Sequence, residues 1–121
     1  MSIPALVPTL ADLVVEVGSE PFLITASGDG KPHVVSVRLV IDGEAMQVPA
    51  GRHTGANVAA NPTVTLLWSP VDGADYSLIV DGTAVLVDET TLEVTPTRAV
   101  WHKVAGASGD GPSCVTVEAT T

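Results

Sequence analysis

Residues 51–68 read GRHTGANVAANPTVTLLW, and this stretch governs how the rest of the chain is interpreted. It begins with a small, basic turn and ends with the alternation of a strand at residues 63–68. Between them we expect a short helix at residues 54–60, which Asn61-Pro62 ends because the residue before a proline avoids the helical region. Parallel strands need a long crossover, and this helix is short, so the stretch favours an antiparallel sheet.

The turn, Gly51–Asn57, contains Arg52 and His53 side by side in a chain with few cations. A helix start presents unpaired N–H groups and a partial positive charge, which suit a phosphate or a carboxylate. We therefore interpret Arg52, His53 and Thr54 as the binding site for the anionic end of a cofactor. The alternative is structural: Thr54 caps the helix, and Arg52 and His53 lie in solvent.

The composition is that of a globular domain with an acidic surface. The chain has 121 residues, 45% of them apolar, and we expect one domain that spans residues 1–121. A formal net charge of −9 repels nucleic acids and anionic membranes, so neither is an expected partner. The single cysteine, Cys114, excludes an intramolecular disulfide and a multi-cysteine metal site. With no basic leader and no apolar run of transmembrane length, the sequence predicts a cytoplasmic protein.

The remaining segments are short and are separated by turn signals. Residues 9–17 have an apolar helical face, and Thr9 and Gly18 are the expected cap and end of that helix. Asp42-Gly43 and Asp81-Gly82 each supply the positive φ that a tight hairpin requires. The expected strands are residues 21–27, 32–41, 45–49, 63–68, 76–80, 83–87, 91–103 with a break at Pro96, and 113–119.

These segments predict a mainly β fold, a closed or partly closed antiparallel barrel in which a helix covers one end. Strand 32–41 alternates between an apolar face and a mixed face. The apolar face carries Val35, Val37, Leu39 and Ile41. The mixed face carries Val34, Ser36, Arg38 and Val40.

Several local motifs follow one another in a distinctive order. Gly28-Asp29-Gly30-Lys31-Pro32-His33 precedes Ile41-Asp42-Gly43-Glu44, the basic turn comes next, and Asn-x-x-x-Asn-Pro-x-Val-x-Leu begins at Asn57. This series resembles the pyridoxamine 5′-phosphate oxidase-like family, whose fold is a six-stranded, FMN-binding split β-barrel. The superfamily also includes proteins that bind the deazaflavin F420. The resemblance covers residues 22–87.

The resemblance implies a flavin site at the interface of a homodimer. The basic turn would bind the FMN phosphate through Arg52, His53 and Thr54, with Asn57 in support. Residues 34–38 and 47–49 would border the flavin ring, and the candidate contacts there are Ser36, Arg38, Val48 and Pro49. Because the flavin performs the redox chemistry, the resemblance implies an oxidoreductase without naming a catalytic residue or a substrate.

The chain departs from the oxidase itself in ways that bear on the ligand. His53-Thr54 stands where the oxidase has an Arg-Lys pair, and Val35 and Val40 lie in the strand that carries its basic contacts. The basic and aromatic substrate-binding tail is also absent. These departures argue against oxidation of pyridoxamine phosphate and leave F420 as an alternative cofactor. A third interpretation is a non-catalytic protein that stores or carries a flavin, or that has lost it.

Other chemistry-bearing residues have structural alternatives. Arg38 is either a cofactor contact or a surface arginine lying over its strand. Trp101, within the second basic segment Arg98–Lys103, either lines a pocket or anchors the core. The histidine spacings do not suit a metal, and no Gly-x-Ser-x-Gly motif supports a hydrolytic serine. Cys114 alternates with valines, which predicts a buried or half-buried strand residue.

Overall fold

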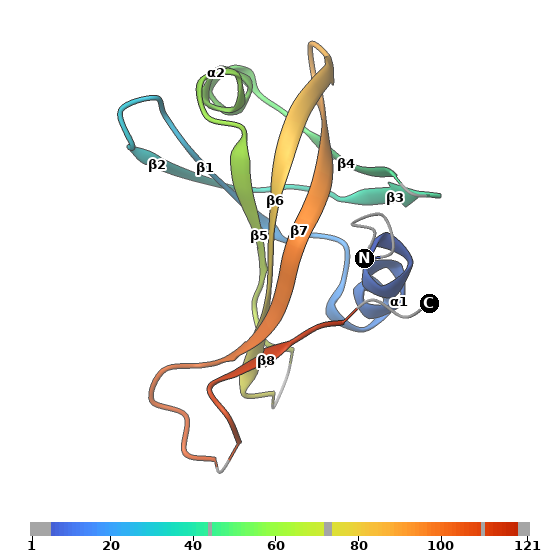
Figure 1. Cartoon of the computed structure of the whole chain (residues 1–121), viewed down its shortest axis with the longest axis vertical. Coiled ribbons are helices and arrows are strands. Elements are labelled where there is room, and N and C mark those ends of the chain that lie inside the picture. Colours follow the sequence, from blue (N-terminus) through green and yellow to red (C-terminus); the bar gives the residue numbers. More distant parts are fainter. Residues whose placement is uncertain (1–5, 44, 72–73, 110, 119–121) are drawn as a thin grey trace.

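The computed structural model of the chain describes residues 6–43, 45–71, 74–109 and 111–118. Figure 1 shows a strongly curled sheet accompanied by short helices. The helices are α1 (Leu6–Val17) and α2 (Arg52–Ala60). The strands are β1 (Phe22–Ala26), β2 (Pro32–Ser36), β3 (Val40–Asp42), β4 (Ala45–Pro49), β5 (Thr63–Trp68), β6 (Tyr76–Asp88), β7 (Thr91–Lys103) and β8 (Cys114–Thr116).

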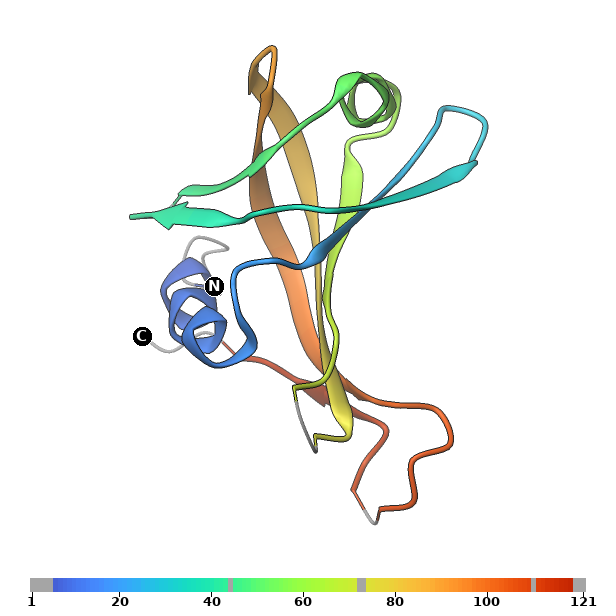
Figure 2. The ribbon, with the colours of Figure 1, turned by 180° about the vertical axis from the view of Figure 1, so that it is seen from behind.

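All eight described strands belong to one sheet, in the order β2-β1-β5-β6-β7-β4-β3, with β8 paired to β7. Every pairing is antiparallel. β2 and β3 lie at opposite ends of this order, yet only residues 37–39 separate them along the chain, so the sheet curls back on itself (Figures 1 and 2). This confirms the mainly β, antiparallel split barrel, with eight described strands where the resemblance implied a six-stranded barrel.

The predicted strand at residues 32–41 is divided into β2 and β3. The intervening segment crosses between the two edges of the sheet, and Val37 and Leu39 donate backbone hydrogen bonds of 3.0 Å to Pro21 and 2.7 Å to Ser19. The alternation of faces is confirmed, because Val37 and Leu39 are buried whereas Val34 is 55% exposed. The chain thus leaves one edge and reaches the other while keeping its apolar face in the core.

The predicted hairpin about Asp81-Gly82 is wrong, because β6 runs without interruption through these residues. Asp81 accepts hydrogen bonds from the hydroxyl of Thr65 at 2.7 Å and the guanidinium of Arg98 at 3.4 Å. The pairing of β6 with β7 shifts register between Asp81 and Gly82, where Gly82 lies opposite Pro96. The extra residue of this β-bulge is Thr97, in β7. Gly82 suits its position because the backbone approaches closely there: an added Cβ would lie 2.5 Å from the backbone oxygen of Thr95. The expected break of the next strand at Pro96 is likewise absent, since β7 is continuous.

The N-terminal helix begins at Leu6, earlier than predicted, so Thr9 lies inside it and is not its cap. Its end is as expected: Gly18 has φ +93° and donates to the carbonyl of Val14 at 2.8 Å. The apolar face of α1 packs against the core, with Leu10 fully buried. Figures 1 and 2 show α1 on the open side of the curled sheet, where it covers the core.

Two predictions for single side chains near the C-terminal strands have opposite outcomes. Trp101 is half-buried and packs against the core, which supports its structural interpretation. Cys114 is exposed, so the buried or half-buried position predicted for it is wrong. The reason is that β8 is short and lies at the margin of the sheet, where all three of its residues are exposed.

Candidate functional site

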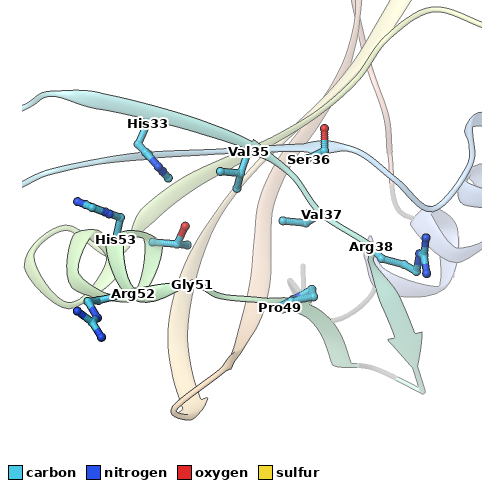
Figure 3. Close-up of a pocket in the computed structure, with 10 residues that line it drawn as sticks. His33, Val35, Ser36, Val37, Arg38, Pro49, Gly51, Arg52 and His53 are labelled. Carbon is cyan, nitrogen blue, oxygen red and sulfur yellow. The ribbon is translucent and has the colours of Figure 1, made fainter.

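A cavity of about 420 Å³ lies where β2 diverges from the segment that joins β4 to α2 (Figure 3). β2 and β4 are not paired with each other in the sheet, so the cavity lies at the split of the barrel. Its walls come from three places: the apolar face and edge of β2, the end of β4, and the first turn of α2. The lining residues are His33, Val35, Ser36, Val37, Arg38, Pro49, Gly51, Arg52, His53 and Thr54.

The first turn of α2 forms one wall of the cavity. The helix begins at Arg52, with Gly51 as an extended N-cap residue that makes no side-chain capping bond. Thr54 is therefore not the cap that the structural alternative required; its side chain is 3% exposed and lies within the helix. The first intrahelical bond runs from the Gly55 N–H to the Gly51 carbonyl at 2.9 Å. The preceding N–H groups have no intrahelical acceptor and are available to an anion.

Two imidazole rings face each other at this end of the cavity. The ring centroids of His33 and His53 are 5.9 Å apart, with 28° between the ring planes. The Nδ1 atom of His33 is buried and has no hydrogen-bond partner among the described residues. A buried polar atom without a partner is costly, so its position suits a ligand that supplies one.

His33 was not among the predicted site residues, although one signal could have found it. It precedes Val35 and Val37 at intervals of two, so strand alternation places all three on the same face. That face turns toward the core, and the cavity opens beside it. A histidine in phase with the half-buried Val35 and the buried Val37, close to a basic turn, is the sequence pattern that indicates this position.

Asn57 holds α2 in place and does not line the cavity. Its side-chain amide donates a 3.1 Å hydrogen bond to the hydroxyl of Thr25, a buried residue of β1. Thr25 in turn lies opposite His33 in the pairing of β1 with β2. Asn57 thus contacts β1, the strand that pairs with β2 at His33.

The residues predicted to border the ring divide into two groups. Ser36, Arg38 and Pro49 line the cavity, whereas Val48 is buried with its side chain in the core and does not. Arg38 forms a 3.0 Å ion pair with Glu20, and these side chains are 77% and 65% exposed. Arg38 therefore lines the cavity and is also a surface residue in an ion pair.

The second basic segment lies apart from this cavity. Arg98 forms an ion pair of 3.4 Å with Asp81 across β6 and β7, and His102 is exposed.

Within the described ranges no cluster of three or more potential ligands could hold a metal ion. No helix in the same part of the chain is both long and apolar enough to cross a membrane.

Comparison with known sequences identifies relatives along most of the chain. A family profile described as pyridoxamine 5′-phosphate oxidase matches residues 19–117. Uncharacterized proteins of Mycobacterium bovis and Mycobacterium tuberculosis are each 35% identical over 108 residues. These matches cover 76% of this chain and 75% of each relative.

Solved structures with similar folds have different ligands in their names. A putative pyridoxamine 5′-phosphate oxidase from Listeria innocua matches with a TM-score of 0.64 and 17% identity, over 79% of this chain and 97% of that one. An F420 reductase matches with a TM-score of 0.58 and 19% identity, over 73% and 94% of the two chains. HutZ, a heme storage protein from Vibrio cholerae, matches with a TM-score of 0.60 and 16% identity, over 74% and 89%. Identities this low establish the fold alone.

Proposed function

This chain belongs to the pyridoxamine 5′-phosphate oxidase family, and on that basis we propose that it binds FMN at the start of α2 and acts as an FMN-dependent oxidoreductase. One observation carries the proposal. Arg38 and Arg52, two of the chain's five Lys and Arg residues, line the cavity together with two of its three histidines, and none of the described lining residues is acidic. In a chain with a net charge of −9, this local concentration of cationic and donor groups suits an anionic ligand.

The phosphate of FMN fits the first turn of α2. Its oxygens would accept hydrogen bonds from the free N–H groups and from the side chains of Arg52 and His53. Arg52 is exposed and makes no ion pair within the described residues, so its charge is available. His33 would offer a nitrogen that now has no partner.

The flavin ring would lie along β2. This is an edge strand, so one row of its backbone N–H and C=O groups faces away from β1 and can meet the polar edge of the ring. Val35, Val37 and Pro49 offer apolar surface for the ring faces. The flavin supplies the electron-transfer chemistry when bound, and the residues of this chain bind it, orient it and exclude water.

A homodimer is part of the proposal, and the outer face of the sheet supports it. Phe22 lies opposite Leu67, Leu67 opposite Ile79, and Ile24 opposite Val34. These side chains form an apolar row across β2, β1, β5 and β6 on the side away from the core, and Phe22 is 38% exposed. A second copy could cover this row through a symmetric contact. Sedimentation velocity should give twice the chain mass; a monomer at all concentrations would contradict this part.

F420 is the second candidate, and one observation favours it. In Figure 3 the guanidinium of Arg52 lies on the opposite side of the α2 ribbon from His33. That direction suits a carboxylate-rich tail that continues past the phosphate, which F420 has and FMN lacks. Affinity for F420 well above that for FMN would replace the first candidate with this one.

The test is a titration of the purified full chain at low salt with FMN, F420 and hemin in parallel. FMN should bind near one equivalent per chain, with quenching of its fluorescence. Binding of hemin alone would indicate a function like that named for the heme storage protein, and binding of none would refute the cofactor proposal. If bound FMN is not reduced by NAD(P)H or by any other donor, a carrier role replaces the oxidoreductase.

A further inference from the structure

A second groove adjoins the cofactor cavity and shares two residues with it, Arg38 and Pro49. Its volume is about 390 Å³. We propose that it binds a small organic molecule with an apolar body and one carboxylate, held by Arg38, as the second ligand of the site. The inference rests on the proposed function only for the identity of the neighbouring cofactor. The groove is lined by Arg38, Val40, Gln47, Val48, Pro49, Thr90 and Thr91.

The walls of the groove are apolar with neutral hydrogen-bonding groups. Val40 lies opposite Gln47 in the pairing of β3 with β4, and Pro49 lies opposite Thr91 in the pairing of β4 with β7. The floor therefore extends over three adjacent strands. Val40 is 56% exposed, so its side chain offers apolar surface that a ligand in the groove can cover. Gln47 offers an amide that can donate to or accept from a polar group on the body of the ligand.

The charge of the groove selects an anion. Arg38 is the one charged side chain among its described lining residues, and a guanidinium can bind a carboxylate through two parallel hydrogen bonds. Glu93 lies opposite Gln47 in the pairing of β4 with β7 but does not line the groove. Asp88, in the adjoining turn, accepts bonds from the N–H and hydroxyl of Thr90 at 2.9 Å and 3.2 Å. Its carboxylate is thus committed to its own turn.

Arg38 already has an exchangeable partner. Its guanidinium meets Glu20 through one contact of 3.0 Å, and both side chains are mostly in solvent. Such exposed pairs contribute little, so a ligand carboxylate that binds Arg38 bidentately can displace Glu20. Because Arg38 also lines the cofactor cavity, a carboxylate bound there would place its apolar body beside the cofactor.

The experiment uses benzoate as the probe and benzamide as its neutral match, titrated separately into the isotopically labelled full chain without cofactor and followed by NMR. Benzoate should bind more tightly and should shift the amides of Val40, Gln47 and Thr91. Arg38→Gln should lower the affinity for benzoate about tenfold and leave the affinity for benzamide unchanged. Glu20→Gln should raise the affinity for benzoate about two- to fivefold, because it removes the carboxylate that competes for Arg38.

Arg98→Gln is the matched control, since it also removes one arginine from a surface ion pair and should not affect either probe. No binding of benzoate at millimolar concentration, or equal benzoate affinity in the wild type and in Arg38→Gln, would overturn the proposal. FMN binding is measured separately on the wild type. If FMN does not bind but benzoate binds in an Arg38-dependent manner, the cofactor proposal is refuted and the groove proposal stands. If FMN binds but benzoate does not, the groove proposal is refuted and the cofactor proposal stands.

Discussion

The side-chain amide of Asn57 in α2 donates a 3.1 Å hydrogen bond to the hydroxyl of Thr25 in β1. Thr25 is buried and lies opposite His33 in β2, whose ring stacks with that of His53 in α2. Two contacts, one polar and one between rings, therefore fix the helix to neighbouring strands of the sheet. The position of the helix start, and of the cavity beside it, depends on this arrangement.

We expect Asn57→Ala to lower the free energy of unfolding by about 1–2 kcal/mol, because the buried hydroxyl of Thr25 loses its donor. Urea denaturation of Asn57→Ala, Thr25→Val and the double variant measures the coupling. The free energy of unfolding should fall less in the double variant than the sum of the decreases in the two single variants. Strict additivity would show that the bond contributes nothing measurable.

The sequence predicts the parts of this fold in which local pattern and tertiary structure agree. The alternation of Val34 with Val37 and Leu39 identified the core face correctly, because one buried face fixes the phase of a strand. The Asn61-Pro62 end of α2 and the Gly18 end of α1 were also correct. In each case the chemistry of one or two residues decides the local conformation.

The errors arise where distant contacts decide between conformations with the same local signal. Asp81-Gly82 suits a hairpin turn by its local chemistry, yet Asp81 bonds to Thr65 and Arg98 on neighbouring strands and β6 continues through it. At the candidate site, Arg52 and His53 were identified from the basic turn. His33 was not, because its proximity to His53 exists only after β2 and α2 pack together.

Gly82→Ala should destabilise the protein by about 1–3 kcal/mol, because an added Cβ would lie 2.5 Å from the backbone oxygen of Thr95. That oxygen belongs to the adjacent strand and cannot move without disturbing the bulge. Gly28→Ala is the control, since its Cβ would meet the Cβ of Ala60 at an ordinary 3.5 Å. Thermal denaturation should separate the two variants, and equal melting temperatures would contradict the steric account.

Arg52→Ala should weaken FMN binding by about 1.5–3 kcal/mol, the range for loss of a hydrogen bond to a charged group. Arg98→Ala removes the same charge at a position paired with Asp81, outside the cavity, and serves as the matched control. Fluorescence titration at two salt concentrations measures both variants. The salt dependence should be smaller for Arg52→Ala than for the wild type. An unchanged affinity for Arg52→Ala would move the phosphate site away from the start of α2.

Ser27→Ala should raise the pKa of Asp29, which is held below its ordinary value of 3.8 mainly by the hydrogen bond that the Ser27 hydroxyl donates to it. A depressed folded-state pKa adds stability above the ordinary value, and that stability is lost as pH falls through the folded value. The wild type should therefore lose more stability on acidification than Ser27→Ala does. Asp88 is the internal control, because the backbone N–H of Thr90 is the main cause of its lowered pKa. Carboxyl NMR titration should show Asp29 moving upward in the variant while Asp88 stays fixed; parallel movement of both would point to a general change in surface charge instead of a local hydrogen bond.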